Sequence, residues 1–409
     1  MIKLFKLITA LSIAGPFMSS AQGYQVNLQG QVQQGMGGAG TGYIADAATL
    51  FFNPGGASFL RGNSANVGVS PTISKGIFLD KNTNQSYTTN SPVSFPFAVY
   101  GTFEVKDSSK LKLGLAIYTP FGSTVEWEDG WAGRFVLTRL QLRTVFLQPT
   151  VSYKINEKIG IGLGLIAASG QVNLQRDLPV VDAAGNYGHA ELKGTAQGFG
   201  FNAGIYYQPV KKFSIGLSYR SQVNMKIDAG DATFKVPFVL GTSFPNGRFT
   251  SELPLPQVAT IGFAFKPNDQ LTLALDVNYV GWKAYDTLAF DYATNTSVLS
   301  DTKSARNYEN TVAFRLGAQY NVNSKFSARI GCAYALSPVQ DGYVTPETPD
   351  ADRINFTLGL GYLVTKNFGL NASFLFTTFK RSGNNIETNI NGTYKTNVTV
   401  PGISVFYNF

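Results

Sequence analysis

The chain has 409 residues, enough for two ordinary soluble domains or one large β-structure. Only 14% of the residues are charged, well below the roughly 25% typical of soluble proteins, whereas 13% are aromatic. This balance excludes a disordered chain and a coiled coil. A single Cys and a single His leave little for a metal centre or for acid–base chemistry, so we expect no catalytic residue, no metal site and no cofactor.

The N-terminus has the composition of a secretory signal peptide. Lys3 and Lys6 precede a short apolar run, residues 7–17, and the small residues at 19–21 follow it. The apolar run is too short to span about 30 Å of hydrocarbon, which argues against the alternative of a membrane anchor. We therefore predict a signal peptide over residues 1–21.

Alternation with a period of two residues recurs along the rest of the chain. In residues 271–279 the odd positions are Leu, Leu, Leu, Val and Tyr, and the even positions are Thr, Ala, Asp and Asn. The same period, which is that of a β-strand, appears in 213–219, 312–320 and 159–165. A soluble sandwich would carry many Lys and Glu residues on its outer face. The sparse charge instead favours a transmembrane barrel whose apolar face contacts lipid.

Strand counting makes the barrel prediction more specific. Short turns such as 154–157 alternate with long polar loops such as 286–307, which is typical of outer-membrane barrels. The last strand alternates up to Phe409, an aromatic ending typical of barrels delivered to the outer-membrane assembly machinery. We predict an all-β fold over residues 63–409, a 14-stranded antiparallel transmembrane β-barrel in the bacterial outer membrane. The candidate strands lie near residues 64–74, 93–105, 110–119, 139–153, 158–174, 190–208, 212–228, 250–266, 270–285, 308–321, 325–336, 352–364, 367–380 and 396–409.

Residues 22–62 differ from the predicted barrel because they are rich in glycine and lack alternation. The cluster Gly35-Met-Gly-Gly-Ala-Gly-Thr-Gly42 contains the letters of a dinucleotide-binding fingerprint, but no strand precedes it and no βαβ unit surrounds it. About 40 residues cannot build a core of their own. We therefore expect this segment to plug the barrel lumen as a hatch, with glycines that allow backbones to approach closely.

The hatch segment also carries a specific resemblance. The glycine cluster, followed by Asp46-Ala-Ala-Thr-Leu-Phe-Phe-Asn53-Pro54-Gly55, resembles the N-terminal hatch of the long-chain fatty acid transporter family (FadL type). Members of that family are fourteen-stranded barrels that import hydrophobic compounds by passive diffusion. The family motif is usually Asn-Pro-Ala, so we expect Gly55 to keep the turn but to loosen it. Further matches follow in the same order, at residues 119–122, 131–134, 253–256, 276–282 and 349–353.

The resemblance implies an extracellular apolar site, a dry pocket in the lumen and a lateral exit. Such a route suits a fatty acid, because each CH₂ group prefers an apolar site by about 0.8 kcal/mol. The loop 121–138 supplies substrate-binding candidates in Trp127, Trp131, Phe135 and Leu137. The alternative is that these side chains pack on their neighbours or form an interfacial aromatic belt.

A lateral exit requires a break in the hydrogen-bonded wall. Centring the second hairpin at 107–108 places Pro96 opposite Thr119 and beside Pro120, with Gly122 following. Proline cannot donate a ladder hydrogen bond, so these four residues are the predicted wall gap. The alternative is that the two prolines mark strand ends.

A carboxylate in a lumen of low dielectric constant needs a cation. Arg220, Arg315 and Arg329 share the phase of the lumen-facing residues and are the candidate carboxylate ligands, and Asp276 could pair with one of them. The alternative is an ion network that braces the barrel interior. If no cation lines the pocket, an uncharged hydrocarbon becomes the favoured substrate.

The sequence therefore predicts a channel rather than an enzyme, importing hydrophobic small molecules and above all long-chain fatty acids. The alternatives are a transporter of uncharged or aromatic hydrocarbons, a general porin, and an outer-membrane hydrolase or adhesin. We expect contacts with outer-membrane lipid and lipopolysaccharide, a hydrophobic ligand, the assembly machinery during biogenesis, and a monomeric state. The formal net charge is +8, but no run of five basic residues suggests a nucleic-acid partner.

Overall fold

The computed structural model describes residues 23–107 and 109–409, so the predicted signal peptide lies outside the described residues. None of the described helices has the length and apolarity needed to cross a membrane. The helices are α1 (Gln31–Gly35), α2 (Thr49–Phe52), η1 (Gly56–Phe59), η2 (Phe238–Leu240) and η3 (Trp282–Ala284). The strands are β1 (Ser64–Val69), β2 (Ile73–Asp80), β3 (Ser86–Thr88), β4 (Phe97–Glu104), β5 (Leu111–Tyr118), β6 (Gly122–Glu126), β7 (Arg139–Lys154), β8 (Ile159–Val181), β9 (Tyr187–Val210), β10 (Phe213–Arg220), β11 (Val223–Lys235), β12 (Gly247–Leu255), β13 (Val258–Phe265), β14 (Leu271–Val280), β15 (Thr287–Tyr292), β16 (Thr302–Ala305), β17 (Thr311–Asn321), β18 (Phe326–Ala335), β19 (Arg353–Leu363), β20 (Phe368–Asn384) and β21 (Asn391–Asn408).

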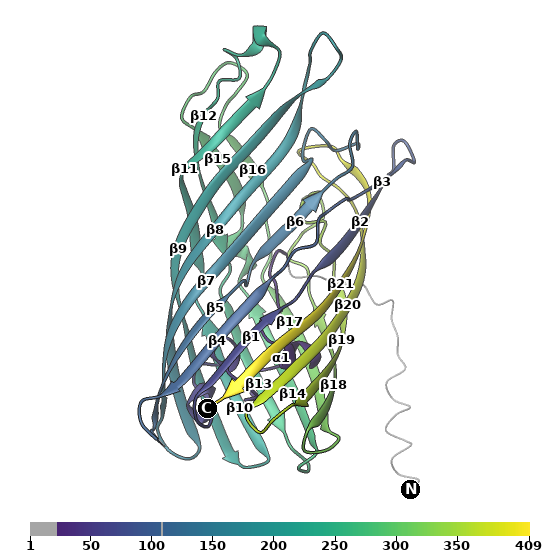
Figure 1. The fold of residues 1–409 in the computed structure, drawn as a ribbon. Helices are drawn as coiled ribbons and strands as arrows, with labels where there is room; N and C mark the ends of the chain where they lie inside the picture. Colours follow the sequence, from purple (N-terminus) through teal and green to yellow (C-terminus); the bar gives the residue numbers. More distant parts are fainter. Residues whose placement is uncertain (1–22, 108) are drawn as a thin grey trace.

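The strands form a closed barrel (Figure 1). Antiparallel pairing runs in the order β1, β4, β5, β7, β8, β9, β10, β13, β14, β17, β18, β19, β20 and β21, and β21 pairs with β1 to close the sheet. The predicted 14-stranded antiparallel barrel is therefore confirmed. The remaining strands pair beyond this closed belt, toward the long loops at the upper end of Figure 1.

The wall has the inverted polarity of a membrane barrel. On β17, Phe314 and Leu316 are 47% and 53% exposed, whereas Arg315 between them is only 5% exposed. Apolar side chains therefore point outward and the polar ones point into the lumen, as the alternation in the sequence predicts.

The hatch, residues 23–62, lies against the lumen face of the wall, where α1 contacts β18, β19, β20 and β21 (Figure 1). Glycine permits this close approach. Gly37 has a φ of +70°, and a Cβ added there would lie 2.5 Å from the carbonyl oxygen of Cys332. On the wall side, a Cβ at Gly216 would lie 1.9 Å from the carbonyl oxygen of Thr41. The hatch and the wall therefore meet backbone to backbone.

Polar side chains fix the position of the hatch. The Oδ2 atom of Asp276 on β14 accepts hydrogen bonds from the backbone N–H groups of Gly40 and Thr41, both at 2.9 Å. The Nδ2 group of Asn53 donates to the carbonyl oxygens of Thr41 at 2.9 Å and of Ile205 at 3.0 Å. These bonds satisfy buried backbone groups of a segment that has little regular structure of its own.

Gly55 lies where the hatch turn meets the barrel wall. Its N–H donates to Asn53 Oδ1 at 3.0 Å, so the turn is kept. A Cβ at Gly55 would lie 2.6 Å from the carbonyl oxygen of Gly204 and 2.8 Å from that of Gly160. The missing methyl group therefore lets the turn lie directly on the wall, and the expected loosening of the turn stays a prediction.

Candidate functional site

The barrel wall is interrupted between β4 and the β5–β6 segment. Thr119 N–H donates to the carbonyl oxygen of Phe97 at 3.3 Å, and farther up Asn90 N–H donates to that of Glu126 at 2.8 Å. Between these two bonds, no backbone hydrogen bond joins 91–96 to 120–125 within the described residues 23–107 and 109–409. We call this interval the wall opening.

The register of the second hairpin differs by one residue from the register that we expected. Ala98 pairs with Tyr118, so Pro96 lies opposite Pro120 and not opposite Thr119. The expected register was wrong because the connecting turn takes up one more residue. The two prolines face each other at the lower edge of the wall opening, directly above the Phe97–Thr119 bond.

A β-bulge bends the third barrel strand at the same level. Tyr118 pairs with Phe146 on β7, whereas Gly122 pairs with Arg143, so the stretch 119–121 contains one residue more than the facing strand. Such an extra residue bends a strand and interrupts its ladder. The prediction from sequence identified the prolines here, but it missed the bulge.

The first described residues of the hatch cover the bulge from inside the barrel. Gly122 N–H donates to the carbonyl oxygen of Tyr24 at 3.0 Å, and Val26 N–H donates to that of Pro120 at 2.8 Å. Gln25 and Phe121 form the antiparallel bridge between them. The lumen side of the wall opening is therefore partly bounded by the N-terminal segment.

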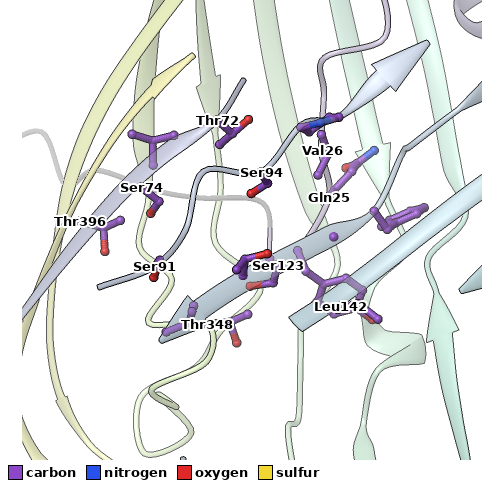
Figure 2. Close-up of a pocket in the computed structure, with 18 of the residues that line it drawn as sticks. Gln25, Val26, Thr72, Ser74, Ser91, Ser94, Ser123, Leu142, Thr348 and Thr396 are labelled. Carbon is purple, nitrogen blue, oxygen red and sulfur yellow. The ribbon is translucent and has the colours of Figure 1, made fainter. Parts of the chain in front are cut away.

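A cavity of about 470 Å³ lies behind the wall opening, and we call it the lateral cavity. Ser91, Ser94 and Ser123 point into the space drawn in Figure 2. Pro96, Thr119 and Gly122 of the predicted wall gap also line it, whereas Pro120 is not among its lining residues. Its size lies within the range of small-molecule sites, about 300–1,000 Å³.

A second cavity of about 80 Å³, the apolar cavity, is lined mainly by aliphatic and aromatic side chains. Glu347 is the one charged residue among its described lining residues, and no cation is present there. Tyr24 and Leu142 line both cavities. The hydroxyl of Tyr24 donates to the carbonyl oxygen of Pro254 at 3.0 Å, and its ring centroid lies 4.8 Å from that of Trp282. The Tyr24 ring therefore stands at the boundary between the two cavities.

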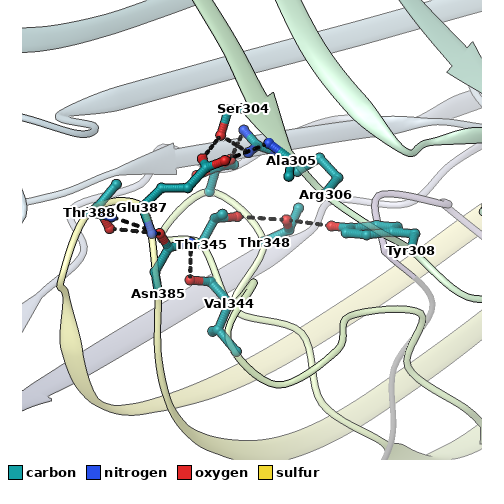
Figure 3. Close-up of polar contacts among 11 residues, drawn as sticks. Ser304, Ala305, Arg306, Tyr308, Val344, Thr345, Thr348, Asn385, Glu387 and Thr388 are labelled. Carbon is teal, nitrogen blue, oxygen red and sulfur yellow. Dashed lines mark hydrogen bonds and ion pairs between the residues drawn. The ribbon is translucent and has the colours of Figure 1, made fainter.

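A polar network joins the extracellular loops above the cavities (Figure 3). Arg306 Nη2 lies 2.8 Å from Glu347 Oε1, and both side chains are nearly buried. Ser304 donates to Glu387 Oε2 at 2.6 Å, and Ser304 Oγ also accepts from Arg306 Nη1. Because Arg306 compensates the charge of Glu347, that carboxylate can border an apolar space.

The aromatic residues predicted for ligand capture are packed inside the loop. The rings of Trp127 and Trp131 stack at a centroid distance of 4.4 Å, and Trp131 Nε1 donates to the carbonyl oxygen of Leu137 at 2.7 Å. Trp131 and Leu137 are buried, and Phe135 packs against Tyr187 at 5.2 Å. The expectation of an exposed cluster is wrong, because these side chains contact each other. Of the four candidates, only Trp127 lines a described cavity.

The three predicted carboxylate ligands are engaged in holding the hatch and wall. Arg220 Nη2 donates to the carbonyl oxygen of Phe51 at 2.8 Å, Arg315 Nε donates to Asn278 Oδ1 at 2.7 Å, and Arg329 Nη1 donates to Asn371 Oδ1 at 3.0 Å. None of the three lines the lateral or the apolar cavity in the described part of the chain. Their contacts are those of the alternative interpretation, an ion network that braces the interior.

The lateral cavity instead contains Asp350 and Arg353, which the sequence prediction did not select as site residues. Both belong to the segment 349–353, which already matched the transporter family. Asp350 is buried, and its Oδ2 accepts hydrogen bonds from Gly23 N–H at 2.7 Å and from Ser337 Oγ at 3.4 Å. Burial raises the pKa of the Asp350 carboxyl to about 7.

The raised pKa of Asp350 predicts a stability that depends on pH. The folded protein holds this proton up to about pH 7, whereas the unfolded chain releases it near pH 4. The group's stabilising contribution is therefore present below pH 4 and is lost as the pH rises to 7, by up to about 1.4 kcal/mol per unit. Denaturant midpoints between pH 4 and 7 should fall for the wild type and fall less for Asp350→Asn. The control Asp341→Asn, at an exposed position of the same loop, should keep the wild-type slope.

Comparisons with known proteins agree with this architecture. Residues 12–409 match the family described as "Outer membrane protein transport protein (OMPP1/FadL/TodX)". The chain is 25% identical over 400 residues to the long-chain fatty acid transport protein of Salmonella typhi, covering 88% of each chain. A FadL homologue from Pseudomonas aeruginosa has a similar structure, with a TM-score of 0.80 and 18% identity over 95% of this chain and all of that one. The toluene transporter TbuX of Ralstonia pickettii has a TM-score of 0.73 and 18% identity over 94% and 99% of the two chains.

The structural similarities, at 18% identity, establish the fold, and the family match establishes membership because it extends over nearly the whole chain. Members of this family are transporters and not enzymes. The protein thus belongs to the OMPP1/FadL/TodX family and is an outer-membrane transporter of hydrophobic molecules.

Proposed function

We propose that the protein imports long-chain fatty acids by passive diffusion, and that the wall opening is their exit into the membrane. On this route a ligand enters the apolar cavity, passes the Tyr24 ring, reaches the lateral cavity and leaves sideways. The observation that carries the proposal is the coincidence of a 470 Å³ cavity with an interval of the wall that lacks backbone hydrogen bonds.

The physical argument concerns the hydration of the chain. Moving a chain of sixteen carbons into water costs on the order of 10 kcal/mol, because each CH₂ group contributes about 0.8 kcal/mol. A route that keeps the chain against apolar side chains avoids this barrier. The shared lining of the two cavities, which includes Leu142, supports such a route, and the exposed Phe95 beside the opening adds an aromatic ring to the lining of the lateral cavity.

The second candidate is import of uncharged hydrocarbons such as toluene. The absence of any cation from the described lining of the apolar cavity favours this reading. The name of TbuX, a toluene transporter of the same fold, is consistent with it. A general porin is less compatible, since the hatch contacts the lumen face of several strands.

Uptake measurements test the proposal. Cells that lack their own channel for hydrophobic compounds would be given the gene, and uptake of labelled hexadecanoate, toluene and a small sugar would be followed. We expect hexadecanoate uptake to rise several-fold and sugar uptake to stay at background. Toluene uptake alone would select the second candidate, whereas sugar uptake with a large steady ion current would contradict both and indicate a porin.

A further inference from the structure

We propose that Lys75, Lys380 and Lys395 form a docking surface for the phosphate groups of lipopolysaccharide on the outside of the barrel. We call these three residues the lysine surface. They lie on the neighbouring strands β2, β20 and β21, and all three are exposed. None of them is among the described lining residues of the lateral or the apolar cavity, so this surface is separate from the proposed transport route.

Cross-strand pairing brings the three lysines together. Lys380 on β20 lies directly opposite Lys395 on β21, and Ile77 on β2 lies opposite Lys395 on its other side. Lys75 is two positions from Ile77, so it shares the same outward face. Residues directly opposite each other have Cβ atoms about 4.5–5.5 Å apart, and like charges placed this way destabilise a sheet. The pair of lysines therefore repels itself unless an anion lies beside it.

No carboxylate of the protein offsets this charge. Within residues 23–107 and 109–409, none of the three ammonium groups forms a hydrogen bond or an ion pair. The carboxylates on the adjoining segments already have other partners: Asp80 with Asn82, Glu126 with Arg139, Glu128 with Thr88, Asp341 with Arg381, and Glu387 with Ser304.

Exposed lysines on β9 and β11 are arranged differently. Lys193 Nζ lies 2.9 Å from Glu191 Oε1, and Lys226 Nζ lies 4.0 Å from Glu252 Oε2. Each of these lysines thus has a carboxylate on the same outer surface. The lysine surface is by contrast a concentration of positive charge that the described part of the chain leaves unneutralised.

The height of the lysine surface corresponds to the head groups of the outer leaflet. The exposed Tyr407 lies at the short-turn end of β21, and from there to Lys395 the strand extends about 40 Å. A strand tilt of 35–45° converts this length into roughly 30 Å of height, whereas the apolar band of such a barrel is about 25 Å tall. On β20, the exposed rings of Phe374 and Phe376 precede Lys380 on the same face. The lysines therefore stand just above the apolar band, on the side of the long loops.

Lipopolysaccharide matches both the charge and the height. It fills the outer leaflet of the bacterial outer membrane, and its lipid A moiety carries phosphate groups just above the acyl chains. A lysine ammonium has three N–H donors and binds phosphate as a compact point charge. A phosphate seated between Lys380 and Lys395 offsets their repulsion, and Lys75 adds a further positive charge on the same face.

Native mass spectrometry tests the proposal. The detergent-solubilised full chain would be titrated with bis-phosphorylated lipid A. We expect the double variant Lys380→Gln/Lys395→Gln to bind it at least about tenfold more weakly than the wild type, because each lysine near an anionic membrane surface adds to the attraction. Lys75→Gln should have a smaller effect, since Lys75 lies diagonal to the pair. Dephosphorylated lipid A should bind the wild type and the double variant equally weakly.

Lys193→Gln/Lys226→Gln is the matched control, because it removes the same charge from exposed lysines that have carboxylate partners. This control should bind lipid A like the wild type. The lysine surface is overturned if the control loses as much affinity as the Lys380→Gln/Lys395→Gln variant, or if that folded variant keeps wild-type affinity. Displacement of lipid A by an equal concentration of inorganic phosphate or phosphatidylglycerol also overturns it, since the surface would then bind any small anion or any anionic lipid.

Lys380→Glu gives a second result that misfolding does not produce. The substitution places a carboxylate opposite Lys395, so it should raise the unfolding temperature in lipid-free detergent while lipid A binding is lost. A lower unfolding temperature would show that the two lysines do not repel each other, and the reason for a bound phosphate would then be gone.

Discussion

Replacing Asp276 with Leu should turn the plugged barrel into one that conducts ions. The carboxylate holds the hatch by accepting the N–H groups of Gly40 and Thr41, and it lies directly opposite Arg315 on the neighbouring strand. The substitution leaves two buried donors without an acceptor and removes a negative charge that acts on the buried guanidinium of Arg315. Each buried donor left without an acceptor costs about 1–3 kcal/mol, which is large for a hatch with little structure of its own.

Planar-bilayer recordings would measure this effect. Wild-type protein should show little steady current, and Asp276→Leu should show frequent or sustained openings. Asp276→Asn is the matched control, because the amide oxygen can still accept a hatch N–H, so its conductance should lie closer to that of the wild type. A quiet Asp276→Leu barrel would mean that the remaining contacts, such as those of Asn53 and of Gly216 with Thr41, are enough to hold the hatch.

Deleting Pro120 should abolish uptake through the wall opening. The deletion removes the extra residue of the bulge, so that the pairing of Tyr118 with Phe146 continues in register to Gly122 and Arg143. A continuous third strand would remove the bend that separates it from residues 91–96. We expect hexadecanoate uptake to fall at least about tenfold while the barrel stays folded, because the deletion would close the exit and not merely narrow it.

The control for this deletion keeps the number of residues. Pro120→Ala adds a backbone N–H but retains the bulge, and we expect it to lower uptake much less. If Pro120→Ala blocks uptake as fully as the deletion, the missing N–H group matters more than the bulge. Full uptake by a folded deletion variant would contradict a lateral exit at this place.

The barrel could be predicted from sequence because the property that defines it is local. Each strand alternates between lipid and lumen, and a period of two residues is visible without knowing any partner strand. Leu316 and Arg315 fall on opposite faces in the sequence and in the structure. The hatch could also be predicted from sequence, since its many glycines indicate close backbone contact even when the contacting wall residues are not known.

The site was harder to predict because its properties depend on partners that are distant in the chain. Arg220 and Arg353 are both arginines on barrel strands, yet Arg220 donates to the carbonyl oxygen of Phe51, whereas Cζ of Arg353 lies 5.5 Å from the centroid of the Phe379 ring. The contact of Arg220 depends on the docked position of the hatch, which the sequence alone does not show. The buried Trp131 illustrates the same limit, since an apolar loop looks identical in sequence whether it is exposed or packed.

The direct contact between Gly37 and the backbone of Cys332 has a consequence for the cell envelope. Because no side chain separates the hatch from the barrel wall at such points, the hatch has no gap there into which it could move. If cargo leaves through the wall opening, as proposed, its path would stay separate from any aqueous passage to the periplasm. Many copies of the protein would then add uptake of hydrophobic molecules without opening the envelope to polar solutes.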